Sequence, residues 1–410
     1  MRMYAQWFVL AGVVLLLAVG LQSGYGAGFG LYEGSARGNA LGGTMVGRAD
    51  DPSAIYYNPA GITQLSGMQV MVGATAIRPS TTVKTMTPAG EVSTESEDNT
   101  WIPPHLYGTY QVVDNVWAGV GLFSRFGLGT EFPSDWPGRY NSYDAEIQTL
   151  TLNPDVALKL NDQISVAAGV NATWFDLTLK QKIPTTPDYN PATDIDAKMT
   201  GDAIGYGYNF GVRYQPLKWV AFGAAYQSEV DEDVDGSIDL GAWDSDASGD
   251  VTLPSEIQLG VVFMPTEKLS LEVGALRTGW SSYDQLKIKF DDPTVLGPES
   301  TSEKDWDDVW RYQCGVEYKL SDRLDLRVGY TYDEEPIPGD TVDYLVPAND
   351  RQLYSIGCGY HVKDWTLDLS YTYLTIRDRD VDARMDDGVL PSKFRDGETH
   401  LLGVSLSAKL

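Results

Sequence analysis

Alternation of apolar and polar residues dominates the chain from Gly67 to its last residue. A repeat of two places alternate side chains on opposite faces of a β-strand, so each alternating segment predicts a strand with one apolar and one polar face. Aromatic residues are common near the ends of these segments, which is typical of membrane-barrel girdles and also of ordinary sheets. The clearest alternating segments are 206–214, 310–320, 324–332, 365–373 and 400–410.

The connections between these segments are of two kinds that follow one another in strict order. Six are short, seven are long and polar, and together they join fourteen predicted strands. Short turns at one end and long loops at the other are typical of an outer-membrane barrel. We therefore predict an all-β fold, a transmembrane antiparallel β-barrel of about 14 strands over residues 68–410. The short connections are 112–115, 160–162, 216–218, 265–268, 320–323 and 362–364; the long ones are 80–100, 125–146, 181–203, 231–250, 291–308, 333–350 and 377–398.

The charge distribution supports a membrane wall. The chain has 57 Asp and Glu against 30 Lys and Arg, for a net charge of −27. The long connections hold 40 of the acids and 11 of the bases, so they carry −29 and the rest of the chain +2. A lipid-facing wall explains this segregation, because an Arg or Lys at the bilayer midplane costs about 2–4 kcal/mol. The negative sign excludes nucleic acid and polybasic lipid attachment.

Cysteine and histidine usage gives no sign of a metal or catalytic site. Cys314 and Cys358 lie on the apolar faces of the tenth and twelfth predicted strands. With strands about 4.8 Å apart, the two Cα atoms are beyond the ~7 Å reach of a disulfide, so we expect two free thiols. The three histidines lack zinc spacing, and no nucleophile elbow is present. We expect no cofactor, no metal and no enzymatic activity.

The N-terminus has the pattern of a secretory signal peptide. Arg2 precedes an apolar run over residues 7–21, and small residues surround a cleavage site after Gly26. The run is shorter than the ~20 apolar residues of a membrane-spanning helix, although an uncleaved anchor is the alternative. We predict that residues 1–26 are removed on export.

The stretch 27–67 is irregular, with nine glycines and no strand or helix repeat. Such backbone cannot face lipid, because its N–H and C=O groups would lack hydrogen-bond partners. Eight-stranded barrels fill their interior with side chains and barrels of 16–18 strands enclose a channel, so a fourteen-stranded barrel should leave a lumen. We expect residues 27–67 to fold as an N-terminal plug, or hatch, inside that lumen.

The hatch sequence AGFGLYEGSARGNALGGTMVGRADDPSAIYYNPAGITQLSG resembles that of the FadL family, outer-membrane transporters of long-chain fatty acids and other hydrophobic compounds. The match includes the start at Ala27, the acidic pair Asp50 and Asp51, and the triplet 58–60 (Asn-Pro-Ala). Further matching segments are SRFGLGTEFPSDWPGRY (124–140), LNPDVALKLND (152–162), YDEEPIPGD (332–340) and PANDRQLYSIGCGY (347–360).

The resemblance implies a passive uptake mechanism in the outer membrane of a Gram-negative bacterium. A hydrophobic ligand would enter an extracellular groove, occupy an apolar pocket gated by Phe29, and leave sideways through a kink in the third strand. The kink maps onto Ser124–Gly129, with Gly127 and Gly129 as breaks in strand pairing. The protein would be a monomer in contact with membrane lipid and lipopolysaccharide. The site residues implied are Phe29, Asn58, Pro59 and Ala60 for the hatch, and Phe126, Gly127 and Gly129 for the lateral exit.

The substrate stays open between fatty acids and aromatic or alkane hydrocarbons. Asp176 falls near a position where fatty-acid transporters of the family carry a basic residue, and a carboxylate there would repel an acidic substrate. The alternative function is a general diffusion porin for small polar solutes, which would need no hatch. An adhesin or receptor role of the acidic loops would add to transport. The segment 244–250 lacks the glutamate of a calcium loop, although the acidic loops as a group could bind divalent cations.

Overall fold

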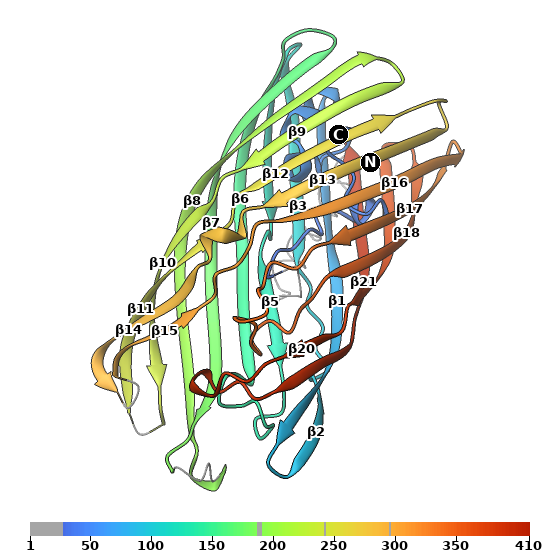
Figure 1. Ribbon diagram of the computed structural model, residues 1–410. Coiled ribbons are helices and arrows are strands. Elements are labelled where there is room, and N and C mark those ends of the chain that lie inside the picture. The colour runs from blue at the N-terminus through green and yellow to red at the C-terminus, as the bar shows by residue number, and fades with distance from the viewer. Residues whose placement is uncertain (1–27, 187–190, 242, 295–296) are drawn as a thin grey trace.

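Antiparallel strands make up most of the computed structural model, which describes residues 28–186, 191–241, 243–294 and 297–410 (Figure 1). The predicted signal peptide lies outside the described residues. The strands are β1 (Met68–Thr87), β2 (Gly90–Glu95), β3 (Pro104–Val113), β4 (Val116–Phe123), β5 (Gly127–Glu131), β6 (Asp144–Lys159), β7 (Ile164–Ile183), β8 (Ile195–Leu217), β9 (Val220–Gln227), β10 (Val230–Asp239), β11 (Asp244–Leu253), β12 (Glu256–Phe263), β13 (Leu269–Thr278), β14 (Gln285–Thr294), β15 (Gly297–Glu303), β16 (Val309–Ser321), β17 (Leu324–Asp333), β18 (Arg351–Val362), β19 (Trp365–Ile376), β20 (Arg379–Val381) and β21 (Ser392–Lys409).

In the described part of the chain these strands form fourteen positions around a closed antiparallel barrel, which we call wall strands. Closure comes from the ladder between β1 and β21, which runs from Gln69↔Lys409 to Thr85↔Ser392. The predicted fourteen-stranded barrel is therefore confirmed. The wall strands in order are β1, β3, β4 with β5, β6, β7, β8, β9 with β10, β11 with β12, β13 with β14, β15 with β16, β17, β18, β19 with β20, and β21.

The two faces of the wall differ as the alternation predicts. Large apolar side chains project from the outer face, and Tyr206 is the most exposed of them at 75%. Both cysteines are free thiols, Cys314 exposed and Cys358 partly buried, as expected from their spacing. The lumen face carries buried polar and charged residues instead, because water or the hatch can satisfy their hydrogen bonds there. Among the buried charged residues are Glu256, Glu272, Arg311, Glu317, Arg327, Asp333, Arg351 and Asp368.

Several segments predicted to be long loops are in fact strand. Within 80–100, β1 continues to Thr87 and turns into β2; within 231–250, β10 and β11 form a hairpin. Figure 1 shows these hairpins at the end of the barrel opposite to the C-terminus. In β10, acids at 231, 233 and 235 face outward while Val230 and Val234 are buried. The wall thus continues beyond its apolar band. In these extensions acidic residues alternate with small apolar ones, so the strands lack the strong hydrophobic repeat by which a strand is predicted.

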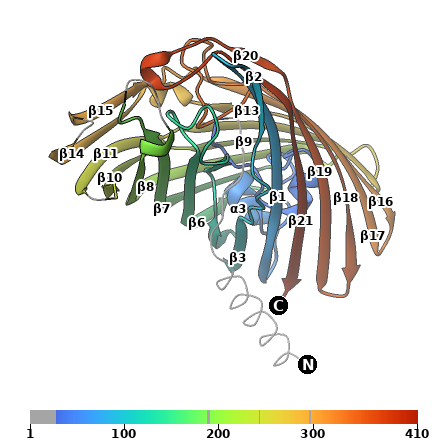
Figure 2. The same ribbon diagram turned by 90° about the horizontal axis from the view of Figure 1, so that it is seen from below.

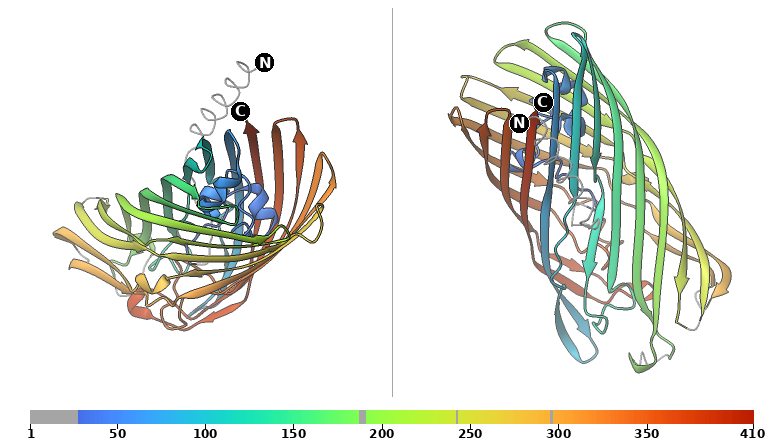
Figure 3. Two further views of the ribbon diagram at one scale, coloured as in Figure 1. Left: turned by 90° about the horizontal axis from the view of Figure 1, so that it is seen from above. Right: turned by 180° about the vertical axis from the view of Figure 1, so that it is seen from behind.

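The hatch lies inside the barrel, enclosed by the wall strands in Figures 2 and 3. It holds the short helices α2 (Ala36–Ala40), α3 (Ala54–Tyr57) and η1 (Pro59–Gln64). Ser35 caps α2 by accepting a hydrogen bond from Gly38 N, and Asn58 caps η1 in the same way. Helices this short are unstable alone, so packing inside the wall holds them. No helix among the described residues is long and apolar enough to cross a membrane.

Candidate functional site: an apolar pocket beside a break in the wall

The seventh to tenth wall strands are interrupted where an apolar pocket forms in the lumen. The interruptions lie between β9 and β10, β11 and β12, β13 and β14, and β15 and β16. Pro254 has no N–H for a ladder at the second of them, and the short helix η3 (Trp280–Ser282) follows Gly279 at the third. Irregular backbone at this depth is tolerated because the barrel encloses it. The interruptions deliver Trp280, Tyr283 and Trp306 to the lumen.

These three aromatic residues surround Phe29, the second described residue of the hatch. Its ring centroid lies 4.6 Å from that of Trp280, 5.5 Å from Tyr283 and 5.6 Å from Trp306. Phe126 completes the cluster at 6.1 Å, and Phe29 is 1% exposed. The contacts with Phe126, Trp280 and Tyr283 are edge-to-face, and such contacts add about 0.5–1.5 kcal/mol each to the gain from burial. The hatch N-terminus is therefore firmly seated in this state.

The third wall strand is broken at residues 124–126, between β4 and β5. Pairing with β3 ends at His105↔Phe123, and among the described residues β5 has a strand partner, β6, on one side. The hatch fills the missing place, because Gly30 forms an isolated antiparallel bridge with Phe126. Leu31 N donates to Arg125 O at 2.7 Å, and Gly127 N donates to Phe29 O at 2.8 Å. A hatch segment thus serves as a short strand in the wall.

The two glycines expected to break the pairing do not do so. Gly127 and Gly129 both belong to β5 and pair with β6, and the break lies just before them. Gly129 has a different role: a Cβ there would lie 2.3 Å from Cζ2 of Trp101, so the missing side chain makes room for the indole ring. Trp101 itself is bridged to Ile77 of β1. Trp101 therefore packs on β5 at Gly129 while its main chain pairs with β1.

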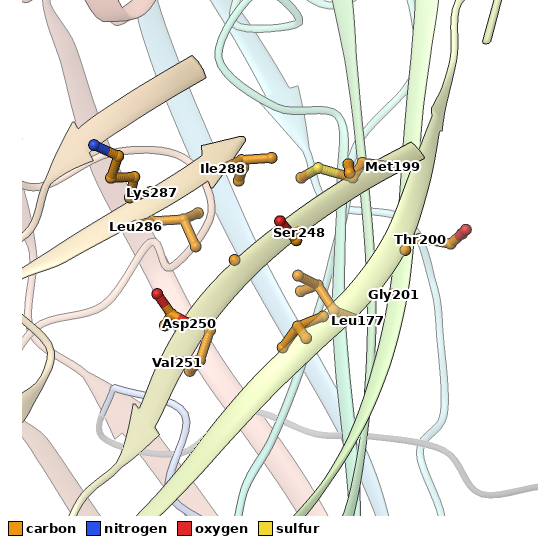
Figure 4. Close-up of a pocket in the computed structure, with 14 residues that line it drawn as sticks. Leu177, Met199, Thr200, Gly201, Ser248, Asp250, Val251, Leu286, Lys287 and Ile288 are labelled. Atoms are coloured by element: carbon orange, nitrogen blue, oxygen red, sulfur yellow. The ribbon is translucent and has the colours of Figure 1, made fainter. Parts of the chain in front are cut away.

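Three cavities adjoin one another on the hairpin side of Phe29. The innermost, which Phe29 lines together with Phe175 and Leu177, holds about 20 Å³, enough for one water molecule. A groove of about 410 Å³ shares Leu179, Leu286 and Lys304 with it and opens between the hairpins. A third space of about 30 Å³ lies between β8, β11 and β14. Figure 4 shows its apolar side chains Leu177, Met199 and Ile288 facing a common space, while the ammonium of Lys287 points away.

One buried ion pair lies at the junction of the innermost cavity and the groove. Lys304 Nζ is 2.6 Å from Asp343 Oδ2, and the two side chains are 4% and 6% exposed. Burial lowers the pKa of Lys304, but attraction to Asp343 outweighs it, so the net shift is upward. Both residues lie in connections rather than in wall strands. The cavity wall therefore carries a positive charge that the protein already neutralises.

Asp176 is not the pocket charge that we expected. It is exposed on the outer face of β7, in register with exposed Asp202 of β8, whereas its neighbours Phe175 and Leu177 line the cavity. The strand repeat of two explains the outcome, because a residue between two pocket-lining neighbours must point away from the pocket. The argument against an acidic substrate that rested on Asp176 is thus wrong.

Asn58 connects the hatch to the wall. Its Nδ2 donates to Val46 O within the hatch and to Val212 O of β8, both at 2.9 Å, and its Oδ1 accepts from Ala60 N. A Cβ at Gly211 would lie 2.5 Å from Asn58 Oδ1 and 2.9 Å from Pro59 Cδ, so a glycine in the wall permits this close approach. Pro59 and Ala60 are buried beside it at the start of η1.

Sequence reasoning missed the ionic contacts between hatch and wall. Arg37 Nε lies 2.9 Å from Glu317 Oε2, and Arg48 Nη1 lies 3.0 Å from Glu317 Oε1. Arg327 Nε also reaches Glu317 at 2.7 Å. One buried carboxylate thus receives three guanidinium groups. The polar positions on the lumen face indicated only that their side chains have some polar partner. A single sequence does not show which residues pair when they lie so far apart in the chain.

A closed barrel of fourteen strands with a hatch in its lumen defines an outer-membrane transport protein. Residues 17–409 match the model of the outer membrane protein transport protein family (OMPP1/FadL/TodX). The chain belongs to this family, as the hatch sequence predicted, and the family consists of outer-membrane transport proteins rather than enzymes. The protein is therefore located in the outer membrane.

Similar proteins extend over nearly the whole chain. The long-chain fatty acid transport protein of Escherichia coli O6:H1 (strain CFT073) is 25% identical over 406 residues, which is 88% of this chain and 90% of the relative. A Pseudomonas aeruginosa FadL homologue superposes with a TM-score of 0.79 at 19% identity, covering 90% of this chain and 97% of that one. The P. putida toluene transporter TodX has a TM-score of 0.71 at 20% identity, with 95% and 99% covered. At these identities, the two structures support the fold.

Proposed function

We propose that the protein carries hydrophobic compounds passively across the outer membrane. The seating of Phe29 supports this most directly, because a segment of the hatch fills both an apolar pocket and a break in the wall. Ligand would enter by the groove between the hairpins and reach the pocket when Phe29 withdraws. It would then leave through the break in the third wall strand into the membrane. Removal of the ligand's apolar surface from water, worth about 25 cal/mol per Å², drives the overall transfer and requires no cofactor.

The pocket must open before it can hold a ligand. Its cavity of about 20 Å³ is far below the volume of any hydrocarbon substrate. Withdrawal of residues 28–31 vacates the Phe29 site and frees the edge of β5 at the same time, because one segment serves both. Filling of the pocket is therefore coupled to opening of the lateral exit.

The Lys304–Asp343 pair determines how each class of substrate would bind in the cavity. A neutral hydrocarbon can occupy the cavity without disturbing the pair. A fatty acid would bring its own carboxylate to Lys304 and displace Asp343, which lies in a connection and can move into the groove. The relatives are named for fatty acids in one case and toluene in another. Mass spectrometry of lipophilic compounds that co-purify with the protein will distinguish the two classes.

The remaining parts of the proposal concern the chain and its surroundings. Residues 1–26 are removed as a signal peptide, 27–67 act as the hatch and 68–410 as the barrel. The protein works as a monomer, since one chain closes the barrel and supplies its own plug. Its apolar outer face meets membrane lipid, and its acidic hairpins meet lipopolysaccharide.

A substitution at Phe29 tests the gate. In proteoliposomes, Phe29→Ala should raise the rate of pyrene uptake several-fold, because the Phe29 ring no longer competes with the ligand for the pocket. Phe132→Ala is the matched control: Phe132 is equally buried but stacks on Trp136 and does not line the cavity. Equal rates for wild type, Phe29→Ala and Phe132→Ala would contradict gating. Conductance of the intact protein like that of an open porin in planar bilayers would overturn the transport function itself.

A further inference from the structure

Arg125 occupies the break in the third wall strand and extends across the lumen. Its Nη2 lies 3.2 Å from Oε2 of Glu256, with side-chain exposures of 3% and 2%. Glu256 is the first residue of β12 and follows the interruption of the eighth wall strand. The pair therefore joins two interruptions on different sides of the barrel, one in the third wall strand and one in the eighth.

The same residue binds the hatch through its main chain. Arg125 O accepts the hydrogen bond from Leu31 N, and the next residue forms the bridge to Gly30. The side chain faces the lumen, where its guanidinium also lies 5.1 Å from the centroid of Phe126. The position of the broken segment thus depends on a contact with the far wall and on a contact with the hatch.

The register of the ladders places this pair in a layer of buried charge just below the pocket. Glu256 lies opposite Thr278, and Thr278 opposite Val309, while Trp280 and Trp306 lie on the hairpin side of that level. Two residues further along β16, Arg311 faces Asp333, which in turn faces Arg351 in the ladder. Asp333 Oδ2 forms ion pairs with both arginines.

This layer and the hatch both lie on the axial path of an apolar ligand out of the pocket. Movement along the barrel axis would force the ligand between paired charges that are already removed from water, and separating such charges is strongly unfavourable. Withdrawal of Phe29 to admit the ligand also opens the two main-chain hydrogen bonds between the hatch and the break, so movement through the break separates no buried charges. The sideways route is therefore the easier one.

We infer that Arg125 and Glu256 form a brace across the lumen that positions the lateral exit and closes the floor of the pocket. This inference rests on the proposed function and names the positioning residues for its exit step. The brace fixes residues 124–126 while the hatch moves, and it keeps the axial path ionic. Among the described residues, Arg125 Nε and Glu256 Oε1 have no hydrogen-bond partner, so nothing else replaces the pair if it is lost.

The test removes or exchanges the pair as a unit. Arg125→Met with Glu256→Gln leaves no buried charge unpaired, and Arg125→Glu with Glu256→Arg restores a pair in reverse. We expect the first double variant to raise ion conductance in planar bilayers at least threefold and the exchange to return it at least halfway. Arg277→Met with Asp308→Asn removes a partly exposed pair and is the control. Unchanged conductance in the first variant, or an equal rise in the control, would overturn the brace.

Two features keep this test independent of the proposed function and of folding. Conductance requires no hydrophobic ligand, so failure of the wild type to take up pyrene would overturn the transport function and not the brace. The wild type alone offers a second measurement, amide hydrogen exchange over residues 124–131. The brace predicts at least tenfold slower exchange there than in the exposed connection 161–163, although β5 lacks a strand partner on one side. Equally fast exchange would contradict it.

Discussion

At the residue scale, a missing side chain shapes the wall beside the break in the third wall strand. The indole of Trp101 lies over Gly129, where a Cβ would come within 2.3 Å of it. The sequence alone suggested that this glycine breaks strand pairing, since a glycine inside a strand often marks a bulge. Trp101, the partner that requires this glycine, lies 28 positions earlier in the chain, and its bridge to β1 brings it to this place.

We predict that Gly129→Ala displaces Trp101 and opens the exit. A Cβ contact under 3.0 Å with a rigid indole forces the ring to move, so pyrene transfer into proteoliposomes should accelerate about two- to fivefold. Gly108→Ala in β3 is the matched control, because its Cβ would meet Val120 at an ordinary 3.7 Å. Equal acceleration in both variants would mean that the wall is merely loosened.

At the element scale, the hatch is held by ionic contacts at the end of the barrel with the short turns. Glu317 accepts contacts from Arg37 and Arg48 of the hatch and from Arg327 of the wall. Removing one partner of a buried pair costs about 3–5 kcal/mol, because the other charge stays buried without compensation.

We predict that Glu317→Gln lowers the melting temperature and exposes the hatch to protease, whereas Glu267→Gln in an exposed turn does neither. Protection of the hatch in both variants would show that packing alone holds it.

A second prediction at this scale concerns the connection 334–350 and pH. Burial raises the pKa of Glu335 from its ordinary 4.5 to about 7, although Arg379 and Arg351 oppose the shift. Stability from its neutral form is present in full below pH 4.5 and is lost as the pH rises past 7. Glu335 Oε1 accepts from Ile337 N, and Glu335 N donates to Asp350 Oδ1, both at 3.2 Å. After correction for intrinsic rates, amides of this connection should exchange faster at pH 8 than at pH 6, and Glu335→Gln should abolish the difference.

The elements also show what the sequence could and could not predict. Alternation was sufficient to predict the wall strands, because lipid on one face imposes a repeat of two that is visible in a single sequence. It missed the hairpin extensions, where both faces are polar or small, and the interruptions of four neighbouring wall strands. Glycine content and irregularity placed the hatch in the lumen. Its contacts with Glu317, Val212 and Phe126 depend on pairings between distant residues, which no local pattern encodes.

At the scale of the whole molecule, strength and weakness of the wall are unevenly distributed. The ladder between β7 and β8 runs unbroken over twenty residue pairs, whereas among the described residues the third wall strand lacks a strand neighbour on its β3 side beyond Phe123. The barrel therefore stays closed while one site on its circumference depends on the hatch. Because residues 29–31 occupy both pocket and wall, the proposed route would open by a single displacement of the hatch N-terminus, with the rest of the hatch still anchored.

A reversible crosslink tests that coupling. Gly30 and Phe126 lie opposite each other but exchange no hydrogen bond. The two main-chain hydrogen bonds lie on either side of them, from Leu31 N to Arg125 O and from Gly127 N to Phe29 O. Opposed Cα atoms in such pairs lie about 4.5 Å apart, within the range of a disulfide. Gly30→Cys with Phe126→Cys, in a background with Ser at 314 and 358, should form a bond that reduces pyrene uptake at least tenfold and is reversed by reductant. The single Phe126→Cys variant controls for loss of the ring. Uptake that continues unchanged through the oxidised protein would mean that ligand passes without displacement of the hatch N-terminus.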